Sequence, residues 1–377
     1  MRTRRNEPYS LAAHRRFFFN RLGGAIGLAL CAAPALAGTV PGGTTVVVNP
    51  GDPIETWDVD TAGTLRVAGG STLDITTETG ATVILDGATV TGANQALSLT
   101  NSTGDIRDST ITSTGFSGLA VNALVGGGLP GSVATVTGSQ ITSKGAAVAI
   151  FGNGSVSLSN TTATGELGSI VAPDPWGGGI GILLASGTAS LSDLSEARGD
   201  RNGVVMTLSS SGVPNLANLS LTVENSLIEG LSESAIAVRF DGEPTVSDIF
   251  IRNNARLIGG NGNILEVEGG STANFNVESS ALTGNIVNDA TSTTHVDLSN
   301  NASITGVFDN VTSATLAGGG RWQLAGDSDV GALTLNNGGT VALGDGTAFN
   351  TLTVSGDYAG AGGTLLFNTV LADDASA

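Results

Sequence analysis

Short apolar stretches recur along the chain, and within each of them apolar and polar residues alternate. Examples are "TLRVAG", "TVILDG" and "VSLSN". Each stretch is a few residues long, rich in β-branched residues and followed by Gly, Asn, Asp or Ser, which is typical of short strands joined by tight turns. After the N-terminal segment we find no sustained helical period. The pattern therefore predicts an all-β protein.

These strands belong to a loose repeat. "STITSTGFSGLAV" (109–121) matches "SQITSKGAAVAI" (139–150), and related segments follow as far as "ASITGVFDN" (302–310). We align a turn glycine through the series at Gly115, Gly145, Gly165, Gly199, Gly230 and Gly284. Units of roughly 20 to 35 residues that contain only strands and turns predict a solenoid, because each turn buries its apolar side chains only by stacking on the next.

The predicted fold is a right-handed parallel β-helix. Small inward residues suit a narrow interior, and Gly and Asn suit its corners because they tolerate positive φ. The alternative is an array of β-sandwiches. That architecture favours strands paired around Asn-Gly turns, which are rare in this sequence.

The first 37 residues have the composition of an export signal. Six Arg and one Glu precede the apolar run "LGGAIGLALCAA", which is too short to span a bilayer as a helix. "APALAG" then places small residues at the positions that a signal peptidase reads, so we predict cleavage between Ala37 and Gly38. The pair Arg15 and Arg16 leaves the twin-arginine export route open beside the general one.

Removal of this segment changes the charge of the chain. Taking six Arg and one Glu from 15 basic and 33 acidic residues leaves nine and 32, a formal net charge of −23. The single cysteine, Cys31, is lost with the signal, so disulfides cannot stabilise the mature chain. An acidic surface repels phosphate backbones, and we expect no nucleic-acid partner.

The segment "RWQLAGDSDVGALTLNNGGTVAL" (321–343) resembles the pertactin-like region near the end of autotransporter passenger domains. The shared features are an aromatic-led strand at Trp322, an acidic step at 327–330, a Leu-x-Leu strand at Leu333 and Leu335, and a polar turn. "FNTLTVSGDYAGAGGTLLFNTVLADDASA" (349–377) is similar to the rungs that follow in that family.

The resemblance implies three regions: a signal peptide (1–37), a β-helix passenger (38–310) and a pertactin-like C-terminal passenger region (311–377). The family continues into an outer-membrane β-barrel translocator, which this sequence lacks, so we expect a truncated product, a split gene, or a passenger served by a separate barrel. Such a passenger is expected at the cell surface, in the outer membrane or secreted, and in the periplasm when no barrel serves it. Its C-terminal rungs would fold first, and we expect four aromatic residues to strengthen that nucleus: Trp322, Phe349, Tyr358 and Phe367.

Residues for catalysis are scarce. β-Helix enzymes that cleave acidic polysaccharides need clustered carboxylates beside a Lys, Arg or His. The mature chain has one Lys, Lys144, and one His, His295, far apart in sequence. Asp373 and Asp374 are neighbours, and neighbours on a strand point to opposite faces. No serine-hydrolase motif surrounds a Ser, and no metal-binding spacing is present. We therefore expect a non-enzymatic protein without cofactor or metal. A polysaccharide-degrading enzyme and an inactive truncated passenger are the alternatives.

One tripeptide suggests binding. "ARGDRNG" contains Arg198, Gly199 and Asp200, a sequence that some adhesins present to receptors. A plainer interpretation is that Gly199 is an ordinary corner of the repeat. "VAPDPWGGGIGI" (171–182) interrupts the repeat, and we predict a surface loop there with Trp176 packed on the coil. The leading hypothesis is adhesion or host-surface interaction, with a host-cell receptor or extracellular matrix as partner.

Overall fold

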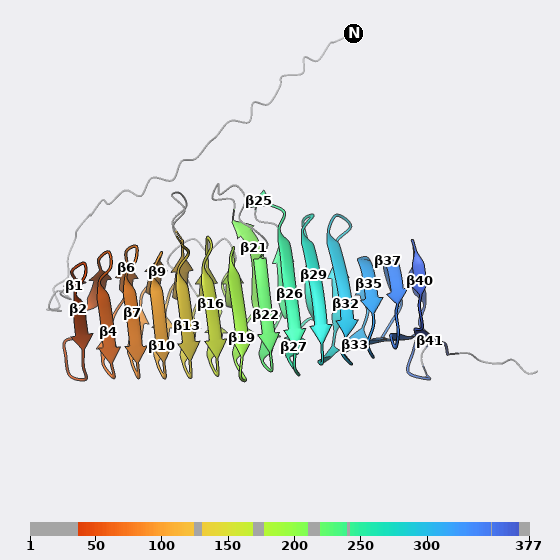
Figure 1. The fold of residues 1–377 in the computed structure, drawn as a ribbon, viewed down its shortest axis with the longest axis horizontal. Coiled ribbons are helices and arrows are strands. Elements are labelled where there is room, and N and C mark those ends of the chain that lie inside the picture. Colours follow the sequence, from red (N-terminus) through yellow and green to blue (C-terminus); the bar gives the residue numbers. More distant parts are fainter. Residues whose placement is uncertain are drawn as a thin grey trace, which may run out of the picture. The chain divides into compact units, whose positions relative to one another are not determined.

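The computed structural model describes residues 37–123, 130–168, 177–209, 219–239, 242–347 and 349–368. Within them every element is a strand, and all described residues belong to one compact unit. Successive strands of each sheet lie side by side in chain order (Figure 1). The predicted right-handed parallel β-helix is confirmed. The β-sandwich alternative is wrong, because the ladders are parallel and join strands of consecutive turns.

We name the two longest sheets A and B. Sheet A contains, in order, β1 (Ala37–Val40), β3 (Thr56–Val59), β6 (Ile75–Thr77), β9 (Gln95–Thr100), β12 (Ser117–Asn122), β15 (Ala146–Ile150), β18 (Ile180–Leu184), β21 (Val204–Ser209), β24 (Ile236–Arg239), β28 (Asn263–Val267), β31 (Asn285–Asn288) and β34 (Phe308–Asp309). The short β25 (Gly242–Glu243) pairs antiparallel with β21.

Sheet B contains, in order, β2 (Thr45–Val48), β4 (Thr64–Ala68), β7 (Thr82–Asp86), β10 (Thr103–Arg107), β13 (Val133–Thr137), β16 (Ser155–Ser159), β19 (Thr188–Ser192), β22 (Leu219–Glu224), β26 (Val246–Arg252), β29 (Thr272–Glu278), β32 (Thr293–Ser299), β35 (Val311–Leu316), β37 (Ser328–Leu335) and β39 (Leu352–Val354). β40 (Tyr358–Gly360) also pairs with β37. The sheet runs without a break across residue 310, where the sequence analysis places a region boundary.

The third side of the coil is divided between two sheets, C and C′. Sheet C contains β5 (Ser71–Thr72), β8 (Thr89–Gly92), β11 (Thr110–Ser113), β14 (Gln140–Ser143), β17 (Thr162–Gly165), β20 (Glu196–Gly199), β23 (Leu227–Gly230) and β27 (Arg256–Gly259). Sheet C′ contains β30 (Ala281–Thr283), β33 (Ser303–Gly306), β36 (Arg321–Leu324), β38 (Thr340–Ala342) and β41 (Thr364–Leu366). Each rung thus runs from sheet B to sheet C or C′ and then to sheet A.

The corner between sheets B and C needs one residue in the left-handed region. Asp108, Asn160 and Asn225 occupy it with φ of 47°, 48° and 45°. Asn and Asp tolerate this conformation because their short polar side chains bond locally. The residue that follows the bend is a buried Ser or Thr in many rungs: Ser109, Ser139, Thr161, Ser195, Ser226 and Ser280. The predicted role of Asn at corners is confirmed.

These buried hydroxyls form a ladder along the coil. The Ser109 amide donates to the Ser139 hydroxyl at 3.0 Å, and the Ser139 amide donates to the Thr161 hydroxyl at 3.3 Å. The Ser139 hydroxyl in turn donates to the Thr137 carbonyl at 2.9 Å. Each of these hydroxyls therefore satisfies a buried amide on the preceding rung, which removes a desolvation penalty of about 1–3 kcal/mol for that amide.

The alignment of the turn glycines is correct in part. Gly165, Gly199 and Gly230 share one register on sheet C, but the residues paired in that register on the preceding rungs are Ser113 and Ser143. The predicted Gly115 and Gly145 lie two positions later, in the turn. Gly199 has no room for a Cβ, which would collide with the Asn202 carbonyl. The Ser113 hydroxyl instead turns back to accept a bond from the Gly115 amide at 3.0 Å.

Like side chains stack inside the coil. One interior column on the third side runs through Val90, Ile111, Ile141, Ala163, Ala197, Ile228, Leu257, Leu282, Ile304, Trp322 and Val341. Each fully buried aliphatic member contributes about 1.5–3 kcal/mol. Trp322 stacks on Phe308 with ring centroids 4.0 Å apart, and its indole N–H donates to the Gly306 carbonyl at 3.1 Å.

The other aromatic residues of the C-terminal region do not join this core. Phe349, Tyr358 and Phe367 are 61%, 52% and 63% exposed, so the expectation that they strengthen a buried nucleus is wrong. Tyr358 is in register with the inward Leu333, but no described strand pairs with β40 on its other side, so its ring stays exposed. Asp327, in the acidic segment 327–330 of the same region, links two rungs, because its carboxylate accepts from the Thr351 amide at 2.7 Å.

The hydroxyl ladder can be tested with Ser139→Ala. The substitution leaves the buried Ser109 amide without its partner, and we expect a loss of about 1–3 kcal/mol in the free energy of unfolding. Urea unfolding followed by circular dichroism measures it. Thr135→Ala, which removes an exposed hydroxyl from sheet B, is the control and should cost less than about 0.5 kcal/mol. Equal effects of the two substitutions would contradict the ladder.

Candidate functional site

Arg198 lies on the outer face of sheet C, on strand β20. Its Nε donates to the Glu196 carboxylate at 2.8 Å, and a second guanidinium nitrogen lies 2.8 Å from the Glu229 carboxylate. The hydrogen bond to Glu196 raises the pKa of Arg198 above its usual value, although burial opposes this. The side chain is held on the sheet between two carboxylates, one from its own strand and one from β23.

The other two residues of the tripeptide are also held. Gly199 is the last residue of β20 and packs against the backbone of its own turn. The Asp200 carboxylate accepts from the Leu167 amide at 2.6 Å, and its carbonyl accepts from the Ser232 hydroxyl at 2.6 Å. A receptor would have to replace these contacts to use Arg198 and Asp200. Receptor binding by this tripeptide stays a prediction.

A second charged cluster lies at the next corner. The Glu233 carboxylate accepts from Arg201 Nε at 2.8 Å and from an Arg239 guanidinium nitrogen at 2.7 Å. Arg239 also donates to the side-chain carbonyl of the buried Asn202 at 3.1 Å. Burial alone would raise the pKa of Glu233, but the hydrogen bonds and charges of the two arginines outweigh it and lower the pKa below its usual 4.5. The sequence analysis did not find this cluster, because its members lie up to 38 residues apart.

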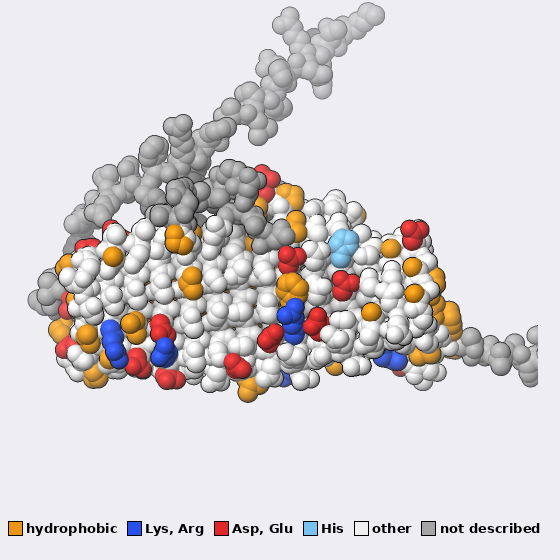
Figure 2. Space-filling view, in the orientation of Figure 1, with side chains coloured by type: hydrophobic (Ala, Val, Ile, Leu, Met, Phe, Trp, Pro, Cys, Tyr) orange, Lys and Arg blue, Asp and Glu red, His pale blue; other side chains and the backbone are white. Residues whose placement is uncertain are grey.

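The largest uniform surface is on sheet B. The outward positions of β13, β16, β19 and β22, apart from Val133 and Glu224, are small hydroxyls in register: Thr135, Thr137, Ser155, Ser157, Ser159, Thr188, Ser190, Ser192, Ser220 and Thr222. We call this set the hydroxyl face. Figure 2 shows the middle of this side of the molecule nearly free of charged side chains, with charges to both sides. The alternation in "SVSLSN" and "TASLSD" carries the signal for it.

Neighbouring rungs hold these hydroxyls in place. The Thr188 hydroxyl donates to that of Ser155 at 2.9 Å, and the Ser190 hydroxyl donates to that of Ser157 at 3.0 Å. Strand spacing sets the rows about 4.8 Å apart, and alternate residues within a strand lie about 6.6 Å apart. The face therefore presents donors and acceptors at fixed, repeating positions.

His295 lies further along the same sheet. Its Nδ1 is 2.7 Å from the Ser313 hydroxyl on the next rung. A serine beside a histidine could form a nucleophile and base. In the described part of the chain, however, no hydrogen bond brings a carboxylate to the other ring nitrogen. The preceding rung instead carries Asn274, which donates to the Asp248 carboxylate at 2.7 Å.

The remaining predicted residues are not brought together. Lys144 forms an ion pair with Glu166 at the corner after β14, on a different rung and sheet from His295. Asp373, Asp374 and Trp176 lie outside the described residues. The predicted loop at 171–182 is shorter than expected, since Ile180 to Ile182 belong to β18. Ala37 and Gly38 belong to β1, where they pair with Thr56 and Trp57.

Two further searches were negative for the described ranges. Among the residues from 37 to 368 that the structure describes, no three His, Cys, Asp or Glu side chains gather to hold a metal ion. The same residues include no helix long and apolar enough to cross a membrane.

Comparison with known proteins gives no relative. No protein-family model matches this chain, and no curated protein matches it.

The Glu233 cluster predicts a pH dependence of stability. Because the folded pKa lies below the unfolded value, the stabilisation is complete above about pH 4.5 and is lost as the pH falls through the folded pKa. Glu233→Gln should therefore weaken the acid dependence of the thermal unfolding midpoint, measured by circular dichroism. Glu243→Gln, at an exposed site outside these ion pairs, is the control. An unchanged acid dependence in Glu233→Gln would refute the assignment.

Proposed function

We propose that this chain is an exported, non-enzymatic passenger of the autotransporter type, and that it acts in adhesion or in contact with a host surface. The observation that carries the proposal is the hydroxyl face of sheet B. A rigid row of small hydroxyls at repeating positions suits a broad, extended polar partner, whereas a small substrate requires a concave site with converging groups.

The sequence resemblance supports the same proposal from another direction. The region 311–377 is similar to the pertactin-like end of autotransporter passengers, and the N-terminal 37 residues have the composition of an export signal. In such a system an outer-membrane β-barrel would carry the passenger to the cell surface. The partner is then a host-cell receptor or the extracellular matrix.

Three features of the hydroxyl face suit a surface that binds a partner without catalysing a reaction. Its residues are neutral at all physiological pH values, they lie on sheet strands that cannot close around a substrate, and inter-rung hydrogen bonds fix the rotamers of two pairs at its centre. Fixed rotamers reduce the entropy lost on binding. Weak individual bonds repeated over many rungs also give avidity to a repetitive partner.

Binding by the hydroxyl face can be tested with the double substitution Ser157→Arg and Ser190→Arg. Two bulky charges at the centre of the face would block close approach, and we expect attachment to matrix-coated or cell-coated wells to fall by at least about tenfold, equivalent to about 1.4 kcal/mol. Attachment of the purified chain is measured over a range of concentrations.

A matched control lies on sheet C. Thr142 and Thr164 are also paired, half-buried outward residues on successive rungs. The substitutions Thr142→Arg and Thr164→Arg add the same charge and should leave attachment within about twofold, because surface changes remote from an interface are nearly neutral. Equal losses in both double variants, or no attachment by the unmodified chain, would count against the proposal.

The proposal that this chain is a passenger also predicts the order in which its rungs fold. If the C-terminal rungs fold first and template the rest, interactions there are already formed in the transition state. Trp322→Ala, which removes the stack on Phe308, should then slow refolding by about tenfold or more. Stopped-flow refolding from urea, followed by far-ultraviolet circular dichroism, measures the rate.

The control for folding order is Leu65→Ala in β4, near the other end of the coil. Leu65 is fully buried like Trp322, and its truncation also leaves a cavity. In a C-terminus-first mechanism this change should mainly speed unfolding. The opposite result, slow refolding with Leu65→Ala and normal refolding with Trp322→Ala, would overturn the mechanism.

A further inference from the structure

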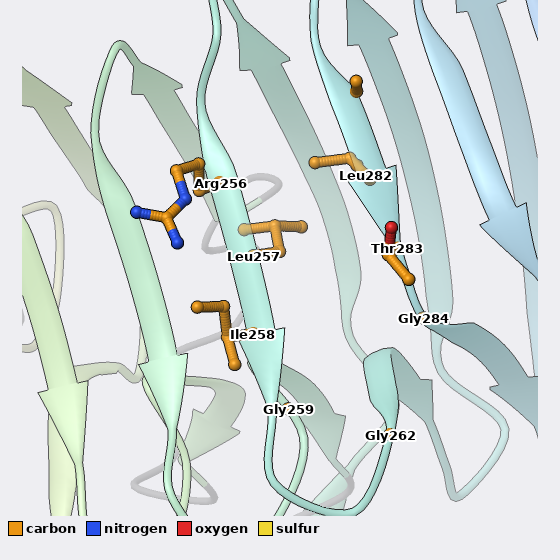
Figure 3. Close-up of a pocket in the computed structure, with 9 residues that line it drawn as sticks. Arg256, Leu257, Ile258, Gly259, Gly262, Leu282, Thr283 and Gly284 are labelled. Atoms are coloured by element: carbon orange, nitrogen blue, oxygen red, sulfur yellow. The ribbon is translucent and has the colours of Figure 1, made fainter.

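The coil contains a cleft away from the hydroxyl face and the charged clusters. It lies on the third side, between β27 and β30, and has a volume of about 440 Å³. Figure 3 shows the two strands facing each other, with Leu257 and Leu282 between them and Arg256 directed away. Its walls are strand backbone, and Gly259, Gly262 and Gly284 border it without side chains.

The cleft coincides with an interruption of the hydrogen-bond ladders. Sheets A and B continue past it, through β28 to β31 and through β26 to β29. On the third side, sheet C ends at β27 and sheet C′ begins at β30, and no ladder joins them. Two consecutive rungs are therefore coupled on two sides only. In a stacked repeat, stability depends on such nearest-neighbour couplings.

The hydrogen bonds on the far side of each wall identify the backbone groups that face the cleft. The Arg256 and Gly260 amides donate to the preceding rung, at Ser226 and Gly230. Since successive residues of a parallel strand direct their amides to opposite neighbours, the Leu257 amide points into the cleft.

The opposite wall follows the same rule. The Ser280 carbonyl accepts from Ser303, and the Gly284 amide donates to Thr305, so both groups face the following rung. Ala281 and Thr283, which alternate with them, direct their amides and carbonyls towards β27. Both walls of the cleft thus carry backbone groups that elsewhere in the coil bond directly to the next rung.

Water reaches the interior column at this point. Leu257 and Leu282 are 4% and 3% exposed, whereas Ile228 and Ile304 on either side are completely buried. A volume of about 440 Å³ holds on the order of ten water molecules at their liquid density. Unpaired backbone groups in such a space need water, because leaving them unsatisfied costs about 1–3 kcal/mol each.

An extra residue in sheet A explains the separation. Between β28 and β31, Asn263 pairs with Asn285 and Leu265 pairs with Ile286, so Ile264 is a bulge without a counterpart. Ile264 is fully buried. A Cβ on Gly284 would lie 2.7 Å from the Ile264 Cγ2, which places the inserted side chain directly against the start of the next rung. The bulge thus acts as a wedge beside the cleft.

We propose that this cleft is a water-bridged seam at which the coil opens before it unfolds elsewhere. The seam divides the described coil between two consecutive rungs: the first block ends with the rung of β26, β27 and β28, and the second begins with the rung of β29, β30 and β31. Sheets A and B act as the hinge between them. Local opening at the seam exposes the strand edges of β27 and β30 without disrupting the ladders of either block.

Hydrogen exchange with single-residue resolution tests the seam in the intact chain. The amides of Leu257, Ala281 and Thr283 should exchange at least about tenfold faster than those of Ile258 and Leu282, their neighbours on the same strands. The neighbours are an internal control, because they share the strand and differ only in the direction of the amide. Equal protection of both groups would overturn the proposal.

Deletion of Ile264 tests the cause of the seam. Without the bulge, β28 and β31 can pair residue for residue, and we expect the exchange of Leu257, Ala281 and Thr283 to slow to the rate of their neighbours. A folded deletion variant that keeps fast exchange at these amides would overturn the wedge. If the deletion variant does not fold, the exchange pattern of the unmodified chain alone decides whether the seam exists.

Discussion

Direct hydrogen bonding between consecutive rungs is the interaction on which this structure depends. A single rung has three short strands and too little apolar surface to offset its loss of conformational entropy. Parallel ladders in sheets A, B and C join each rung to the next and bury the interior side chains in columns. Sequence distance matters little here, because every essential contact lies about one rung away along the chain.

The corners impose a second requirement. Turning from sheet B to sheet C in two residues needs positive φ at the first and removes backbone groups from the ladders at the second. Asn160 meets the first need. The buried Thr161 hydroxyl donates to the Ser159 carbonyl at 2.9 Å, a carbonyl that also accepts from the Gly138 amide at 3.0 Å. The same hydroxyl accepts a hydrogen bond from the Ser139 amide on the preceding rung, so the residues of the bend also join neighbouring rungs. The corner is therefore a point of cohesion between rungs.

Much of the fold could be predicted from the sequence, because alternation and turn residues act locally. Strands such as "VSLSN" and corners such as Asn160 follow from a few adjacent residues. The register of the turn residues did not follow from the sequence. Gly115 and Gly165 look equivalent there, yet the residue that shares the register of Gly165 is Ser113. A serine fits this position because its hydroxyl can close the turn with a hydrogen bond. The cluster around Glu233 and the bulge at Ile264 also escaped detection, because both depend on which rungs become neighbours. The residues of the hydroxyl face are recognisable in the sequence, but they form a continuous face only because several strands are aligned.

The first strand of sheet A has a consequence for the order of events during export. Gly38 lies beneath the ring of Trp57, where a Cβ would sit 2.7 Å from the ring carbons, and Ala37 pairs with Thr56. A peptidase cleaves an extended segment that is free of other partners. The predicted cut between Ala37 and Gly38 must therefore come before β1 joins β3. In the proposed export route, cleavage and the pairing of β1 with β3 therefore compete for the same few residues, and a chain that paired them early would keep its N-terminal segment.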